Sequence, residues 1–379
     1  MKRTTNRRAK GSGSITKKGD IWFCRIEVKD AEGKTRHKTF NAKTKVEGNK
    51  WLEEMNRQRG RGKDLSKQEP TVSEYLTQWL NERQSEVRPS TYRSYQLMVE
   101  SYIRPYLGSL KLSAITRESV VNLFRLHEKQ GKSANTIRII RIVLNNMLEQ
   151  AFRDDLLTQN VVRKTKSPRV EHKTASALRD EVAVKLIAAC NDHPQGLLIQ
   201  TILTLGLRKG EALGLKWEAV NFEEGTVQVL GQLQYENGVL LLTQLKTQKS
   251  KRTMRLPDIL VQRLRAQRER QLQLKEEWSE WVDSGHVFTS SIGTPLDPRK
   301  VGRILDELMD RIEEPRIRVH DLRHSAATLM LQSGVSIKTV SDVLGHSQIS
   351  LTADTYVHLV PALESDAVNG LERLLNGKS

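Results

Sequence analysis

The chain has 379 residues and a formal net charge of +17, and hydrophobic residues make up 37% of it. This length exceeds one ordinary domain and predicts two or three. No run of about 18 apolar residues occurs, and the basic first ten residues lead into Gly and Ser, so we expect no membrane span and no signal peptide. These features favour a cytoplasmic protein.

The positive charge is concentrated in the first 170 residues. Residues 1–70 contain 20 Lys and Arg against 9 Asp and Glu, residues 71–170 contain 16 against 9, and the remainder contains 26 against 27. This distribution favours a polyanionic partner held by the N-terminal part, with a solubilising tail as the alternative. The two cysteines, Cys24 and Cys190, match no C-x-x-C spacing, so we expect no zinc site.

The first predicted module covers residues 1–65 and combines strands with a helix. Residues 1–10 predict a flexible arm, alternation over 21–29 and a second run at 34–40 predict a hairpin, a short strand is expected at 14–17, and a helix at 43–59. Basic side chains on such strands suit a β-ribbon that enters a DNA groove. The candidates for DNA contact are Arg25, Lys34, Arg36 and Lys38. Solvated strand edges are the alternative for each.

A linker rich in Gly, Lys and Gln at 60–70 leads to a predicted helical domain over residues 70–165. Its first helix has the one-sided stripe Val72, Tyr75, Leu76, Trp79 and Leu80. Three further helices are predicted at 90–103, 116–129 and 133–153. The tyrosines at 92, 95, 102 and 106 are interpreted as core residues.

The third predicted domain covers residues 174–379 and mixes helices with short strands. Strands are expected at 226–233, 239–245 and 252–256. Helices are expected at 181–191, 195–205, 257–281, 299–311, 320–333, 337–344 and 362–375. The predicted fold class is therefore multidomain and mainly α, with small β-sheets and a mixed α+β C-terminal domain.

Cleaving a phosphodiester without a metal requires a nucleophile, cations for the charge of the transition state and an acid for the leaving oxygen. The C-terminal half contains residues for each role. Arg208 lies in L-G-L-R-K-G-E, a tight turn before a helix, and His320 and Arg323 lie three apart in H-D-L-R and share a helix face. The remaining candidates are Lys246, His346 and Tyr356.

The ordered set Arg208, Lys246, His320-x-x-Arg323, His346 and Tyr356 resembles that of the tyrosine recombinases, specifically the integrases of phages and mobile elements. The resemblance covers nearly the whole chain. The basic strand module resembles the family's arm-binding domain, and the helical region, with S-Y-I-R-P-Y-L-G-S-L, its core-binding domain. It implies the catalytic domain fold of tyrosine recombinases and type IB topoisomerases at 174–379.

The resemblance also implies a role for each position. Tyr356 attacks the scissile phosphate and forms a 3′-phosphotyrosine, Arg208 and Arg323 hold the non-bridging oxygens, and His346 donates a further hydrogen bond. His320 assists proton transfer, Lys246 protonates the leaving oxygen, and Glu211 orients these groups. The implied partners are double-stranded attachment sites, three further protomers in a homotetramer, an excisionase and a host DNA-bending protein. No cofactor or metal is implied.

Several alternatives stay open on the residues alone. Lys249 or Lys251 could replace Lys246, since all three lie in one predicted turn, and His320 with His324 could form a metal pair at i, i+4. Tyr235 is the only other tyrosine after residue 170. A topoisomerase with the same chemistry and a catalytically silent DNA-binding regulator are the alternative functions.

Overall fold

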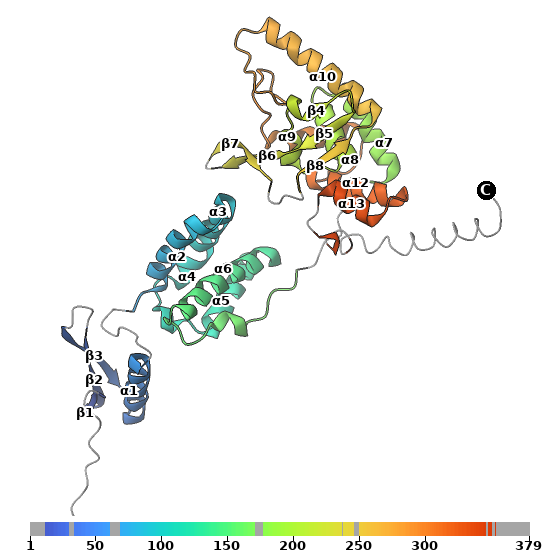
Figure 1. The fold of residues 1–379 in the computed structure, drawn as a ribbon. Coiled ribbons are helices and arrows are strands. Elements are labelled where there is room, and N and C mark those ends of the chain that lie inside the picture. Colours follow the sequence, from blue (N-terminus) through green and yellow to red (C-terminus); the bar gives the residue numbers. More distant parts are fainter. Residues whose placement is uncertain are drawn as a thin grey trace, which may run out of the picture. The chain divides into compact units, whose positions relative to one another are not determined.

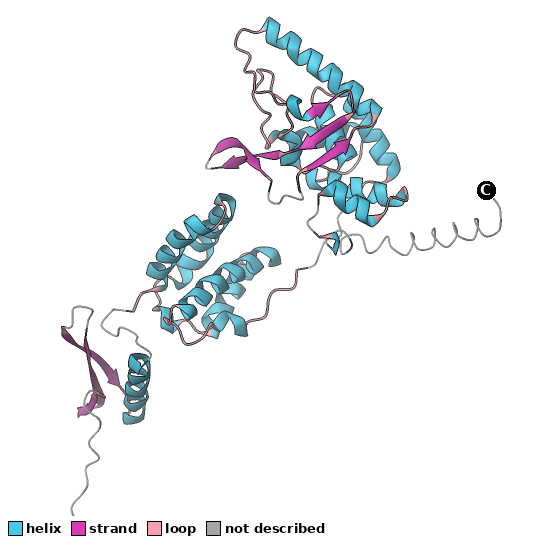
Figure 2. Cartoon of the chain, viewed as in Figure 1, coloured by secondary structure: helices cyan, strands magenta, loops and turns pink. Residues whose placement is uncertain are grey.

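The computed structural model describes residues 12–29, 34–60, 69–170, 177–236, 238–245, 250–345, 348–350 and 353. The chain divides into two compact units, Met1–Glu171 and His172–Ser379. Figure 1 labels most elements of both units, and Figure 2 shows that helices predominate and that the strands form small sheets. The expected arm at 1–10 and the expected helix at 362–375 lie outside the described residues.

The first unit begins with a three-stranded antiparallel sheet in the order β1-β2-β3, which is followed by one helix. Alternation along β2 buries Cys24, Ile26 and Val28, and the last two pack with Leu52 of the helix. The predicted hairpin and helix are therefore confirmed. The elements are β1 (Ser14–Lys18), β2 (Ile21–Lys29), β3 (Thr35–Ala42) and α1 (Lys45–Gly60).

The rest of the first unit is a helical bundle whose apolar faces form one core. A π-helical turn, Val99–Ile103, continues the second helix into the third. Thr71 and Glu74 cap the first helix, because each accepts a hydrogen bond from the other's backbone N–H. The helices are α2 (Val72–Glu86), α3 (Pro89–Met98), α4 (Arg104–Leu107), α5 (Arg117–Lys129) and α6 (Ala134–Arg153).

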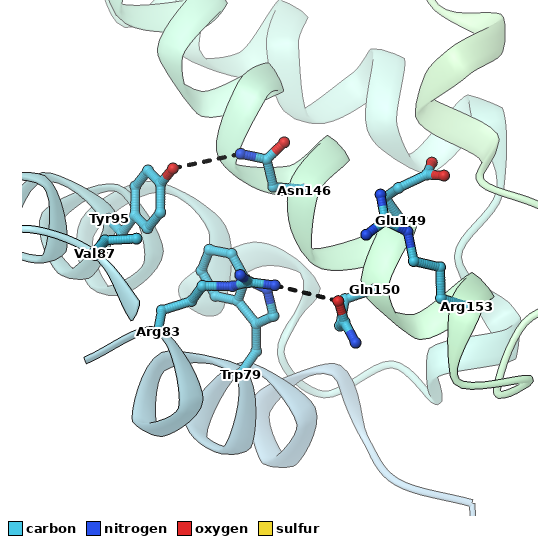
Figure 3. A pocket seen from close by; sticks show the side chains of 8 residues that line it. All are labelled: Trp79, Arg83, Val87, Tyr95, Asn146, Glu149, Gln150 and Arg153. Atoms are coloured by element: carbon cyan, nitrogen blue, oxygen red, sulfur yellow. Dashed lines mark hydrogen bonds between the residues drawn. The ribbon is translucent and has the colours of Figure 1, made fainter. Parts of the chain in front are cut away.

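Trp79 occupies the middle of this bundle, beside a pocket between α2, α3 and α6 (Figure 3). Its side chain is completely buried and stacks on Tyr95 with 5.4 Å between ring centroids. The Arg83 guanidinium lies 5.7 Å from the centroid of the indole ring and donates a hydrogen bond to Gln150 at 3.2 Å. Within the described residues, the indole Nε1 has no hydrogen-bond partner.

The second unit has two small antiparallel sheets and seven α-helices in its described residues. One sheet has the order β4-β5-β8, and the hairpin β6-β7 forms the other. The strands are β4 (Val220–Asn221), β5 (Thr226–Val229), β6 (Gly231–Glu236), β7 (Val239–Gln244) and β8 (Arg252–Arg255). The helices are α7 (Asp180–Ala189), α8 (Gly196–Leu205), α9 (Lys209–Leu213), α10 (Asp258–Glu277), α11 (Lys300–Arg311), α12 (Val319–Gln332) and α13 (Ile337–Leu344).

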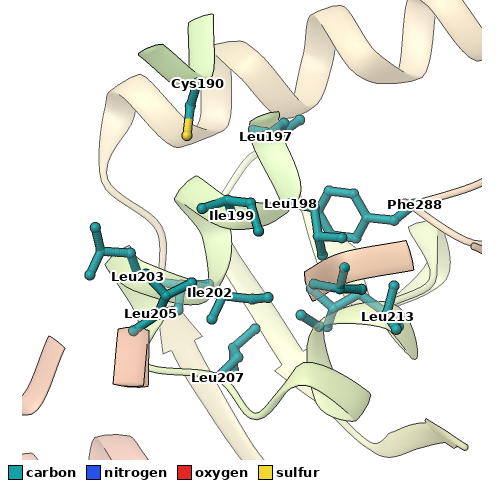
Figure 4. Packing of buried hydrophobic residues seen from close by; sticks show 14 of the residues in the cluster. Cys190, Leu197, Leu198, Ile199, Ile202, Leu203, Leu205, Leu207, Leu213 and Phe288 are labelled. Atoms are coloured by element: carbon teal, nitrogen blue, oxygen red, sulfur yellow. The ribbon is translucent and has the colours of Figure 1, made fainter. Parts of the chain in front are cut away.

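Helix α8 forms the centre of this unit. Nine of its ten residues are buried, as expected for a helix that is apolar on all sides, and it packs against α10, α11 and α12. Figure 4 shows its Leu and Ile side chains together with Leu207, Leu213 and Phe288. The buried helix thus fixes the start of the turn that carries Arg208.

Two predicted elements differ in the structure. The strand expected at 226–233 is divided between two sheets, because Leu230 is half exposed and a side chain at Gly231 would come within 3.1 Å of the Thr243 carbonyl oxygen. The helix expected at 257–281 ends at Glu277, because Trp278 has extended backbone angles. Among the described residues, no helix is long and apolar enough to cross a membrane.

Candidate active site

Arg208 is anchored by a buried carboxylate. It stands at the N-cap of α9 with extended backbone angles, and its N–H donates to Oε2 of Glu211 at 3.1 Å. Its Nη1 donates to the other oxygen, Oε1, at 2.7 Å. The Glu211 side chain is 1% exposed, whereas that of Arg208 is 38% exposed. The arginine is therefore held by a buried carboxylate while its side chain stays partly exposed.

Two further arginines surround Glu211. Nη2 of Arg252 donates to Oε2 at 3.0 Å, and Nη1 of Arg323 lies 4.0 Å from the same oxygen. We call Arg208, Glu211, Arg252 and Arg323 the Glu211 cluster. Burial raises the pKa of Glu211, but the charges and hydrogen bonds of Arg252 and Arg208 outweigh it, so this pKa lies below its usual value. The cluster thus holds one carboxylate ionised among three cations.

Within the Glu211 cluster, Arg323 joins the ends of two helices. Its side chain is 4% exposed, and it donates to the carbonyl oxygens of Gly206 at 2.8 Å and Leu344 at 2.6 Å. Both helices end in a left-handed glycine: Gly206 has φ 59° after α8, and Gly345 has φ 66° after α13. A cation at these carbonyl groups satisfies helix ends that lack internal partners.

His320 lies in the first turn of α12, on the helix that carries Arg323. Its ring meets that of His324 edge to face, with 4.8 Å between centroids. Burial of the ring lowers the pKa of His320, and the charges of His324, Arg323 and Arg208 add to this effect. The imidazole is therefore biased toward the neutral form, which can accept a proton. Asp321 accepts the backbone N–H of Arg318 at 3.0 Å and so caps the helix.

The structure brings Arg208, Glu211, His320 and Arg323 into one site. Lys246, His346 and Tyr356 lie outside the described residues, as does Lys249. No group of three His, Cys, Asp or Glu side chains that could hold a metal ion occurs in the described part of the chain. The pair His320 and His324 accordingly has no third ligand of these types there.

Arg252 was not among the predicted site residues, because in K-S-K-R-T-M-R it is one of several cations. The signal was its spacing from Met254. Residues two apart in a strand share a face, and Met254 is buried, so Arg252 lies on the buried face of β8 as well. A buried arginine requires a partner, and that partner is Glu211.

The strand register separates the four candidate DNA-binding residues of the first unit. Arg36 is paired with Val28 and Lys38 with Ile26, so both share the face of β3 that α1 covers. Arg25 is paired with Thr39 and Ser14 on the opposite, exposed face. Lys34 directly precedes β3, and its side chain is exposed. One face of the sheet cannot present all four side chains.

Comparison with known proteins agrees with this architecture. The model of the Phage integrase family matches residues 176–362, and that of the Phage integrase, N-terminal SAM-like domain, matches residues 71–125. Among solved structures, a Tn1549 transposon integrase in complex with transposon right end DNA is similar with a TM-score of 0.67 and 20% identity, covering 80% of this chain and 99% of that one. A lambda integrase dimer bound to a COC′ core site is similar with a TM-score of 0.56 and 18% identity, covering 92% and 96%.

These structures define the fold class as that of the integrases. A tyrosine recombinase XerC-like protein of Caldanaerobacter subterraneus subsp. tengcongensis is 30% identical over 91% of this chain and 94% of its own length. An integrase of Saccharopolyspora erythraea is 25% identical over 98% of both chains. The chain belongs to the tyrosine recombinase family, and it is a site-specific recombinase.

Proposed function

We propose that this recombinase integrates or excises a mobile element by cleaving and rejoining DNA through a 3′-phosphotyrosine at Tyr356. The observation that carries the proposal is the Glu211 cluster, in which a buried carboxylate holds the partly exposed Arg208 near Arg323 and His320. A fixed guanidinium suits the charge that develops on a phosphate under attack. The relatives include an ICEBs1 integrase of Bacillus subtilis, 25% identical over 76% of this chain.

The proposed step exchanges one phosphoester bond for another. The Tyr356 hydroxyl oxygen attacks the scissile phosphorus, the new bond joins phosphorus to this oxygen, and the bond to the 5′ oxygen breaks. His320 assists removal of the phenolic proton, and Lys246 gives a proton to the 5′ oxygen. Arg208, Arg323 and His346 bind the non-bridging oxygens, while Glu211 orients Arg208. Because the ester bond is conserved, the reverse reaction rejoins a strand without ATP.

We assign the DNA-holding role to the basic N-terminal parts, within domains at 1–65 and 70–165, and the chemistry to 174–379. On the sheet, the four candidates for DNA contact divide between two faces, with Arg25 on one and Lys34, Arg36 and Lys38 on the other face or its edge. The proposed partners are double-stranded attachment sites, a homotetramer on DNA, an excisionase and a host DNA-bending protein. A lambda integrase tetramer bound to a Holliday junction supports the assembly by likeness of fold.

The test is to trap the covalent intermediate. Duplexes from the DNA that flanks the gene would carry a nick beside the cleavage position, so that the short 5′-hydroxyl fragment diffuses away and the adduct accumulates. We expect wild-type protein to form the adduct and Tyr356→Phe to bind the same DNA without forming it. An adduct with Tyr356→Phe would refute the nucleophile. Cleavage without sequence preference would favour a topoisomerase, and specific binding without cleavage a silent regulator.

A further inference from the structure

The side chain of Arg252, at the start of β8, is only 8% exposed and makes three hydrogen bonds to protein groups. Nε donates to the carbonyl oxygen of Val343 at 2.7 Å, and Nη1 donates to that of Ser250 at 3.1 Å. Nη2 donates to Oε2 of Glu211 at 3.0 Å. Each nitrogen of the planar guanidinium therefore points at a different segment of the second unit.

Each of these partners adjoins a residue of the proposed mechanism. Ser250 directly follows the segment 246–249, which contains Lys246. Val343 lies in the last turn of α13, three residues before His346. Glu211 holds the backbone and the guanidinium of Arg208. One side chain thus connects three parts of the chain, each of which lies within four residues of a catalytic candidate in the sequence.

Two arginines bind the C-terminal end of α13. Its last carbonyl groups have no partner within the helix, and Arg252 binds that of Val343 while Arg323 binds that of Leu344. Gly345 follows, and a side chain there would come within 3.0 Å of Nη1 of Arg252. Glycine at this position therefore permits both the left-handed turn and the close approach of the arginine.

We propose that Arg252 is a positioning residue, which holds Arg208 through Glu211 and fixes the chain at Ser250, four residues after Lys246, and at Val343, three residues before His346, without touching the DNA. Its burial and its three protein partners set it apart from Arg208, whose side chain is 38% exposed. This inference rests on the proposed function, because it assumes that Arg208, Lys246 and His346 act on the phosphate.

The test compares full-length Arg252→Gln and Arg252→Ala with two matched controls. Arg255 is exposed on the same strand, so Arg255→Ala removes a charge alone. Arg263 is a half-buried arginine of the same unit that donates to the Cys190 carbonyl oxygen at 2.8 Å and to the Gln200 side chain. Arg263→Ala therefore removes stabilising hydrogen bonds at a place outside the Glu211 cluster. The readouts are the single-turnover rate of adduct formation on the nicked duplex, DNA affinity and thermal unfolding.

We expect both Arg252 variants to lose about 100-fold in cleavage rate while DNA affinity stays unchanged, because small misplacements of catalytic groups cost this much. Arg263→Ala should lose stability and keep its rate at temperatures where it is folded. Millimolar guanidinium should raise the rate of Arg252→Ala and leave that of Arg263→Ala unchanged. The proposal would be overturned if the Arg252 variants cleaved as fast as Arg263→Ala when the folded fractions are equal. It would also be overturned if guanidinium did not raise the rate of Arg252→Ala. If wild-type protein forms no adduct, the proposed function fails instead.

Discussion

Glu211 accepts two hydrogen bonds from Arg208, one from its backbone and one from its side chain, although the Glu211 side chain is 1% exposed. Three guanidinium groups lie near the Glu211 carboxylate and offset the desolvation cost of burying its charge. Removing one member of such a buried set leaves uncompensated charge, so the cluster is expected to contribute to folding as well as to catalysis.

Glu211→Gln preserves the size of the side chain and removes its charge. We expect the free energy of unfolding to fall by about 3 kcal/mol near neutral pH, and the cleavage rate to fall with it. The folded pKa of Glu211 is lowered from 4.5, so its contribution is complete above pH 4.5 and is lost as the pH falls through the folded pKa. Urea denaturation should therefore show the difference between wild type and variant shrinking below pH 4.5.

The control for this experiment is Glu218→Gln, since the Glu218 side chain is 76% exposed and lies 3.9 Å from Lys216. This change should leave stability and cleavage unchanged. An equal loss of stability in both variants would count against the Glu211 cluster.

Gly206→Ala tests the turn before Arg208. Alanine would be left-handed at φ 59°, and its Cβ would come within 2.8 Å of Leu344 Cδ2, so we expect a loss of about 1–2 kcal/mol in unfolding free energy and slower cleavage. Gly302 lies within α11 with open space around it, so Gly302→Ala should raise stability by up to about 1 kcal/mol. Thermal unfolding distinguishes the two signs, and a stabilising effect of Gly206→Ala would contradict the turn.

The pH dependence of cleavage tests His320. Its pKa lies below 6.5 because of burial and then the neighbouring His324, Arg323 and Arg208. If the neutral ring is the active form, the rate should stay high at pH 6.5 and decline only as the pH falls through the lowered pKa. Single-turnover rates across this range measure the acidic limb of the pH–rate profile. A cleavage rate in wild-type protein whose acidic decline has its midpoint at or above pH 6.5 would contradict this assignment.

Trp79 tests the helical bundle of the first unit. Trp79→Ala should lower the unfolding free energy by about 3–5 kcal/mol, because a large and completely buried ring is lost. Trp79→Phe should cost less, since it keeps the aromatic contact with Tyr95 and removes an indole N–H that has no partner in the described part of the chain. Calorimetry of the full chain measures both, and equal losses would show that the indole N–H is needed.

The sequence predicted most helices because their apolar stripes are long and one-sided, as in α2, and it predicted the β2-β3 hairpin because alternation buries Ile26 and Val28. It could not divide β5 from β6 at Leu230, since Val227, Val229 and Leu233 keep one alternating pattern across the break between the two strands. In the site, the motifs offered Arg208, His320 and Arg323 as catalytic candidates and the family resemblance added Glu211, and these roles stay predictions. Arg252 was missed because its role depends on Val343, which is 91 residues away.

The proposed 3′-phosphotyrosine at Tyr356 can be identified by mass spectrometry of the trapped adduct after digestion of the protein and the DNA. We predict a nucleotide attached through its 3′ phosphate to the peptide that contains Tyr356, and a free 5′-hydroxyl on the released fragment. A nucleotide on Tyr235 or on any other residue, or a linkage through a 5′ phosphate, would contradict the claim.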